Sequence, residues 1–312
     1  MAAGNDRATQ SCVGTLTRTW RRPSLTALEV AWRWSFGGPA LALILYKVLG
    51  VLRTATGGTL DPARLGLDKV LLGDPVGALS ADPMGAAAKF AGGISLVLPG
   101  IERFAVWLVP LLLVGWVVQS SVGRTLVLRR VDATMKVRVG TVMVLQAIRL
   151  AVLSGVIWVW IELVEWSSRT AILQPIALKA EPNLVLYCGM VIVISLGMFT
   201  AWALVSWVLA MAPLLAMLRD LGVVASLRAA VGLGKVRGRL AEINLVLGIV
   251  KIALIVLAMV FSATPLPFES VTTAEFLAWW WLGVGVVYLL WSDFFHVARL
   301  VGYLDLYRGA EG

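Results

Sequence analysis

A few charged and polar side chains stand inside stretches of sequence that are otherwise apolar. Arg149 and Lys251 each lie about eight residues into such a stretch, which at ~1.5 Å per helical residue is roughly 12 Å deep. Asp293 and His296 stand near the end of the last apolar stretch, and Gln146 lies one helical turn before Arg149. Charges inside a membrane are costly, so they commonly mark a functional site or a structural ion pair. We therefore expect these five residues to form an inner polar cluster.

A second group of charges lies toward the opposite ends of the apolar stretches. Lys47 is near the end of the first stretch, while Glu162 and Glu165 are near the end of the third. We expect Lys47 to pair with one of these glutamates. The alternative for Lys47 and for Lys251 is that the long side chain extends along apolar surface to the headgroups. Arg149 lies nearest to mid-membrane and is therefore the leading candidate for a functional charge.

The patterns that most enzymes and cofactor sites need are missing from the sequence. One histidine and two distant cysteines, Cys12 and Cys188, do not make a tetrahedral zinc site, and we expect no disulfide between them. Ser292 precedes His296 by one helical turn, but no motif of a serine hydrolase surrounds the pair. The run Gly232–Lys235 lacks the first glycine and the final Ser/Thr of a phosphate loop. We expect no metal and no cofactor, and the balance is against an enzyme.

The composition explains why these charges stand out. Of the 312 residues, 59% are apolar and 14% are charged, against about 45–50% and about 25% in soluble domains. These values exclude an ordinary cytosolic enzyme, a disordered chain and a disulfide scaffold. Six stretches approach the ~20 mostly apolar residues that cross a bilayer: about 36–52, 104–118, 141–163, 184–209, 243–263 and 276–297. The sequence therefore predicts an all-α polytopic membrane protein with six transmembrane helices.

The distribution of Lys and Arg predicts the orientation. The segments 1–35, 119–140 and 219–242 each carry five basic residues, whereas 164–183 carries two and 264–275 carries none. Because basic residues concentrate in cytoplasmic segments, we expect both termini in the cytoplasm. The predicted organisation is a basic leader (1–35), a six-span bundle (36–297) and a cytoplasmic tail (298–312). The net charge of +9 is then a topology signal rather than a sign of nucleic-acid binding.

The first outer loop, about 53–100, is the longest segment outside the predicted spans. It contains the pairs Asp61-Pro62, Asp74-Pro75 and Asp82-Pro83. Asp caps the free N–H groups of a helix start and Pro suits its first position, so we expect three short helices. The loop is too apolar for free solvation and should lie on the outer membrane face, or over the mouth of the bundle. A segment near 92–98 that re-enters the membrane is the alternative.

Two inner connectors resemble each other and carry a likeness to a known family. Lys136-Val137-Arg138 precedes the third span and Lys235-Val236-Arg237 precedes the fifth, which suggests a duplicated hairpin. The Ser-Leu-Arg-Ala-Ala stretch 226–230, followed by Lys-Val-Arg-Gly-Arg and an apolar span, resembles a six-helix bacterial membrane family. This family includes the membrane region fused to some glycerophosphodiester phosphodiesterases, together with stand-alone relatives. The resemblance covers about 40 residues and implies the six-span architecture. It does not imply the phosphodiesterase activity, because that catalytic domain is absent from this sequence.

These observations predict a non-enzymatic protein of the bacterial cytoplasmic (inner) membrane, acting as an accessory, scaffold or lipid-contacting subunit. Its expected partners are the bilayer, with anionic headgroups on the cytoplasmic face, and a protein partner or second copy remains open. The first alternative is a small transporter or channel that uses the inner cluster around Arg149 as a gate or ion site. The second is a membrane-embedded lipid enzyme that uses Glu162 and Glu165.

Overall fold

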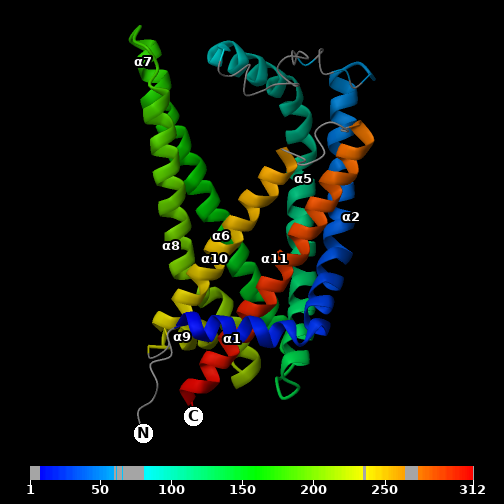
Figure 1. Cartoon of the computed structure of the whole chain (residues 1–312), viewed down its shortest axis with the longest axis vertical. Helices are drawn as coiled ribbons and strands as arrows, with labels where there is room; N and C mark the ends of the chain where they lie inside the picture. The colour runs from blue at the N-terminus through cyan, green and yellow to red at the C-terminus, as the bar shows by residue number, and fades with distance from the viewer. Residues whose placement is uncertain are drawn as a thin grey trace. The chain divides into compact units, whose positions relative to one another are not determined.

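The chain is described by a computed structural model, which covers residues 8–59, 61, 65, 81–234, 237–263 and 273–311. All of its regular elements in these ranges are helical (Figure 1). They are α1 (Ala8–Trp20), α2 (Pro23–Ala55), α5 (Pro83–Val131), α6 (Val139–Ser168), the π-helical turn η2 (Arg169–Leu173), α7 (Gln174–Ala177), α8 (Leu184–Arg219), α9 (Val223–Val231), α10 (Arg237–Ala263) and α11 (Ala274–Glu311).

Six of the described helices are long and apolar enough to cross a membrane, which confirms the predicted all-α, multi-pass class. These spans are Pro23–Ala55, Ala91–Val131, Val139–Ala177, Leu184–Arg219, Gly238–Ser262 and Glu275–Gly309. The helices are longer than the apolar stretches that predicted them. α8, with 36 residues, is about 54 Å long at ~1.5 Å per residue, against roughly 30 Å of hydrocarbon. Each long helix is therefore longer than the hydrocarbon core of a bilayer is thick.

The second span begins much earlier than its apolar stretch indicates. The third Asp-Pro pair starts α5 itself, because the Asp82 carboxylate accepts a hydrogen bond from the Gly85 N–H at 2.9 Å. The helix then runs through Pro99 and Pro110 to Val131. Residues 83–100, predicted to be loop, are thus continuous with the span. The Asp74-Pro75 pair lies outside the described residues, as does the residue after Asp61.

The chain divides into two compact units, which are described separately. Unit 1 comprises residues 1–32 and 120–312, and unit 2 comprises residues 33–119. Within unit 1, α6 packs against α8, α8 packs against α9 and α10, and α11 packs against α1 and α10.

The two ends of α8 have very different surroundings within unit 1. No side chain from Leu184 to Trp202 is buried, whereas every residue from Leu209 to Met217 is buried. A helix end that is buried on all sides must be enclosed by other elements. The enclosed end packs into the main apolar core, whose members also come from α5, α6, α9, α10, α11 and the loop 132–138.

We call this enclosed end of unit 1 the basal end. It comprises α1, α9, the loop 132–138 and the C-terminal turns of α8 and α11, which lie at the lower end of Figure 1. Tyr303, which has no exposed surface, is its largest fully buried side chain. The opposite halves of the long helices carry the exposed apolar residues instead, for example Val185 (85% exposed) and Val193 (70% exposed). Unit 1 is therefore a packed helical core at one end and an apolar surface at the other.

The long helices that the structure describes in unit 2 are the part of α2 after Trp32 and the part of α5 before Ser120. A Cβ added at Gly100 would lie 2.5 Å from Val51 Cγ1, and one at Gly115 would lie 2.8 Å from Phe36 Cε2. A larger residue at either position would therefore require the facing side chain or the helices themselves to shift. A hydrogen bond from Gln119 Nε2 to Ser35 Oγ (3.0 Å) joins the same two helices.

Candidate functional site: a buried polar network

In addition to the main apolar core, unit 1 contains a series of polar side chains that come from all six long helices. Most of these side chains are buried: Glu29 is 1% exposed, Asn244 4% and Arg124 5%. We call the group the basal network, and its members are Glu29, Arg124, Gln146, Ser206, Asn244, His296, Arg299 and Tyr303.

Asn244 on α10 joins three helices through its amide. Its nitrogen donates to Ser206 Oγ at 2.9 Å and to the carbonyl of Ala203, both on α8. Its oxygen accepts from the Tyr303 hydroxyl at 3.1 Å and from Arg299 Nη1 at 3.3 Å, both on α11. The amide therefore uses both of its donors and both lone pairs of its oxygen. A buried polar group that is satisfied in this way stabilises the helix packing instead of opposing it.

His296 is surrounded by charged groups of both signs. Its Nδ1 lies 2.9 Å from Arg299 Nη2, and its Nε2 lies 3.2 Å from Arg124 Nη2 and 3.6 Å from Glu29 Oε1. Arginine can only donate, and a neutral imidazole has one acceptor nitrogen. Only one of the two arginine contacts can therefore be a hydrogen bond. We assign the acceptor to Nδ1, facing Arg299, and the N–H to Nε2, beside the Glu29 carboxylate. The other oxygen of Glu29 accepts from Trp32 Nε1 at 2.8 Å.

Arg124 links α5 to α6 as well as to α11. In the amide orientation that satisfies both side chains, the Gln146 oxygen accepts from Arg124 Nη1 (3.0 Å) and Nε (3.2 Å). A guanidinium with 5% exposure is costly to bury unless its donors find partners. The network supplies these partners, so its first role is to hold charged groups between helices.

The structure brings some of the predicted inner cluster into this network. Gln146 and His296 both contact Arg124. Arg149 is close enough to Tyr303 for its charge to act on the hydroxyl, as are Arg124 and Arg299. Asp293, also on α11, is buried with 4% exposure, whereas Lys251 lies on an exposed part of α10.

The predicted outer charges have other surroundings. Glu165 forms an ion pair with Arg169, which lies one helical turn later; the distance from Glu165 Oε1 to Arg169 Nη2 is 2.5 Å. Glu162 is exposed on α6. Lys47 belongs to unit 2, where its ammonium lies over the ring of Trp107, 5.4 Å from the centroid. The pairing of Lys47 with either glutamate remains a prediction from the sequence.

Four charged or amide members of the network are not predicted from the sequence: Glu29, Arg124, Asn244 and Arg299. Glu29 and Arg124 stand just outside the apolar stretches, where they resemble ordinary flanking charges. A usable signal is nevertheless present, since Glu29, Arg124 and Arg299 flank the apolar stretches of their helices at the same side of the predicted membrane. Asn244, a lone amide in an apolar span, is a second signal.

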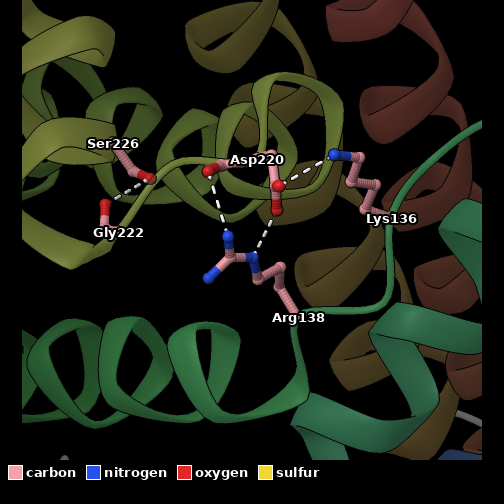
Figure 2. Close-up of polar contacts among 5 residues, drawn as sticks. All are labelled: Lys136, Arg138, Asp220, Gly222 and Ser226. Carbon is pink, nitrogen blue, oxygen red and sulfur yellow. Dashed lines mark hydrogen bonds and ion pairs between the residues drawn. The ribbon is translucent and has the colours of Figure 1, made fainter.

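A smaller polar cluster lies at the C-terminal end of α8 (Figure 2). Asp220 ends α8 in the left-handed conformation, with φ of 59°. Its carboxylate accepts from Arg138 Nε at 2.5 Å and from Lys136 Nζ at 2.8 Å, and its carbonyl accepts from Arg138 Nη2 at 3.2 Å. The Lys136 N–H also donates to the carbonyl of Met217. These contacts tie the loop 132–138 to the end of α8.

Hydrogen bonds in this cluster and in the loop 132–138 lower the pKa values of two acids, Asp220 and Asp132. Hydrogen bonds from Arg138 and then from Lys136 lower the pKa of Asp220 to about 2. The pKa of Arg138 is raised by the same carboxylate. In the same loop, hydrogen bonds from the hydroxyl and the backbone N–H of Thr134 lower the pKa of Asp132, which also pairs with Arg308 of α11. The Lys136-Val137-Arg138 triplet thus has a structural role, while Lys235 and Val236 of its counterpart lie outside the described residues.

The site holds hydrogen-bonding and charged groups but lacks the arrangement of a metal centre. Among the described residues, no group of three or more His, Cys, Asp or Glu side chains could hold a metal ion. Comparison with protein-family models, with curated proteins and with solved structures finds no match to this chain.

Proposed function

We propose that the chain is a non-enzymatic, multi-pass protein of the bacterial cytoplasmic membrane that acts as an accessory, scaffold or lipid-contacting subunit. The observation that carries this proposal is the basal network. Its donors and acceptors come from all six long helices and are largely satisfied by one another. Such a network resists separation of the helices, because each broken contact leaves a buried polar group without its partner. A scaffold needs this property.

In this proposal the basal end faces the cytoplasm. The basic segments 1–35, 119–140 and 219–242 favour this orientation. Exposed basic residues there, such as Arg129 and Arg130, would attract anionic headgroups at about 1 kcal/mol each. The resemblance to the six-helix bacterial family supports the same arrangement of spans.

A small transporter or channel is the second candidate. Its support is the burial of Glu29, Arg124 and Asp293, with exposures of 1%, 5% and 4%, close to the titratable His296. Buried charges of both signs are a common feature of ion and proton pathways. In this candidate Arg149 would act with the network as the gate.

Thiol labelling tests the membrane topology. Cys188, near the start of α8, is exposed and free, so in a Cys12→Ser chain it is the single thiol. A membrane-impermeant maleimide should label Cys188 in intact spheroplasts and not in sealed inverted vesicles. A Gly309→Cys reporter in a chain that also lacks Cys188 should give the reverse pattern. The same pattern for both thiols would contradict the proposed orientation.

Reconstitution separates the scaffold from the transporter. Purified protein in lipid vesicles should give no flux of protons, chloride or phosphate above that of protein-free vesicles. A saturable flux that disappears in Arg149→Ala, in protein of unchanged thermal stability, would overturn the scaffold in favour of the transporter. A stoichiometric protein partner or lipid retained through purification in mild detergent would support the scaffold.

A further inference from the structure

Unit 2 contains a pocket of about 790 Å³ between the C-terminal part of α2 and the N-terminal part of α5. Its volume falls in the range of sites that hold small ligands, roughly 300–1,000 Å³. The residues that give it chemical character are three bases and three aromatic residues: Lys47, Arg53, Arg103, Tyr46, Phe104 and Trp107. None of them belongs to the basal network.

The charges in this pocket are of one sign. Lys47, Arg53 and Arg103 line it, and no acidic residue is among its lining residues in the described part of unit 2. The Lys47 ammonium lies over two aromatic rings, 5.4 Å from the centroid of Trp107 and 5.8 Å from that of Tyr46. Cation–π contacts hold a cation in place without neutralising its charge. The pocket thus gathers positive charge that a bound anion would neutralise.

The wall beside the cations is apolar. Leu96, Phe104 and Trp107 recur at helical spacing on one face of α5, and Leu49 and Val51 line the pocket from α2. The close packing of Gly100 against Val51 brings the two helices together at the pocket. An occupant that satisfies both parts must carry a negative group and a hydrocarbon segment. Free inorganic phosphate would leave the apolar wall unused.

We propose that this pocket binds an anionic phospholipid, with the phosphodiester on Lys47, Arg53 and Arg103 and the acyl chain along Leu96, Phe104 and Trp107. Guanidinium groups match phosphate oxygens in geometry as well as charge. The proposal rests on the proposed membrane-spanning, lipid-contacting function and deepens it by assigning a lipid class to one site. It differs from the attraction of headgroups to the basal end, which requires no pocket.

Lipid titration of the full chain tests the site. Protein in mild detergent is titrated with phosphatidylglycerol, with phosphatidylcholine and with inorganic phosphate, and bound lipid is counted by native mass spectrometry. We expect one phosphatidylglycerol at low concentration, and phosphatidylcholine at least tenfold weaker. Each charge near a membrane surface contributes about 1 kcal/mol, so the triple variant Lys47→Gln, Arg53→Gln, Arg103→Gln should bind about a hundredfold more weakly.

Matched variants distinguish a site from general charge attraction. Lys89→Gln, Arg169→Gln, Lys179→Gln removes the same charge from exposed positions outside the pocket and should leave binding unchanged. Gly50 lines the pocket, and a Cβ there meets no atom within 4 Å. Gly50→Leu should therefore fill the pocket and weaken binding at least tenfold with every charge intact. Gly38→Leu, equally open and on the same helix, is its control.

Every outcome of this experiment bears on the proposal. Equal binding of the two phospholipids, or equal loss in both triple variants, would overturn it. So would unaltered phosphatidylglycerol binding in Gly50→Leu. If inorganic phosphate bound at the same site as tightly as the lipid, the ligand of the pocket would be a free anion and not a phospholipid. Failure here leaves the labelling pattern and the flux result intact, so it is distinguishable from failure of the proposed function.

Discussion

The basal network of unit 1 and the pocket of unit 2 both gather charged side chains in a membrane protein, but in opposite ways. The network mixes signs and is buried: Arg124 is 5% exposed and shares His296 with Glu29. Among the described residues that line the pocket, the charged ones are cations alone, and Lys47 contacts aromatic rings there. Donors that find acceptors within the fold contribute to its stability, whereas cations gathered without an acid need an external anion. This contrast indicates a structural role for the basal network and a binding role for the pocket.

The largest expected effect comes from removing a buried charge. Arg124→Met removes both donors to the Gln146 oxygen, and it removes the cation that lies with Glu29 at His296 Nε2. Breaking a buried pair costs about 3–5 kcal/mol, and thermal unfolding in detergent should report a loss of this size. Arg103→Met in the pocket should cost less than about 1 kcal/mol, as a surface change does. Equal losses in the two variants would remove the distinction between the regions.

The next effect concerns a neutral member of the network. Asn244→Leu removes the partner of Ser206, Tyr303 and Arg299 at once. Leaving buried polar groups unsatisfied costs about 1–3 kcal/mol, measured as a lower denaturation midpoint. If Asn244→Leu were as stable as the wild type, the hydrogen bonds of the amide would not hold these helices together.

Helix packing at the edge of the network gives an effect of similar or smaller size. A Cβ at Gly123 would lie 2.2 Å from Trp32 Cδ2, whereas one at Gly155 on α6 meets nothing within 4 Å. Gly123→Ala should therefore destabilise by about 1–3 kcal/mol, while Gly155→Ala should be neutral or stabilising by up to about 1 kcal/mol. A neutral Gly123→Ala would mean that Trp32, the donor to Glu29, moves freely.

The smallest effect belongs to the partly exposed cluster around Asp220. The pKa of the Asp220 carboxyl is lowered to about 2 in the folded state. The ionised carboxylate therefore stabilises the fold fully above the unfolded-state pKa of about 3.9, and this stabilisation disappears as the pH falls toward 2. The wild type should lose more stability than Asp220→Asn between pH 5 and pH 2 in thermal unfolding. Parallel pH curves for the two proteins would contradict a stabilising role for the carboxylate.

The sequence predicted the class of fold and part of the site. Apolar stretches and charge composition were sufficient for six membrane-spanning helices, because hydrocarbon thickness alone sets their minimum length. The apolar stretches do not predict the helix ends, because helices such as α8, which ends at Arg219, and α5, which begins at Pro83, continue beyond the apolar residues. Gln146 and His296 can be predicted from the sequence, because polar residues are rare in apolar stretches. Arg124 and Glu29 cannot, because their burial depends on contacts between helices distant in sequence.

One measurement tests the division between the two regions most directly: the change in unfolding midpoint that phosphatidylglycerol causes in three proteins. A ligand bound only by the folded state at a hundred times its Kd stabilises by about 2.7 kcal/mol. We expect a clear upward shift for the wild type, the same shift for the less stable Arg124→Met variant, and none for Lys47→Gln, Arg53→Gln, Arg103→Gln. A full shift in the triple variant, or its loss in Arg124→Met alone, would contradict the division between the two regions.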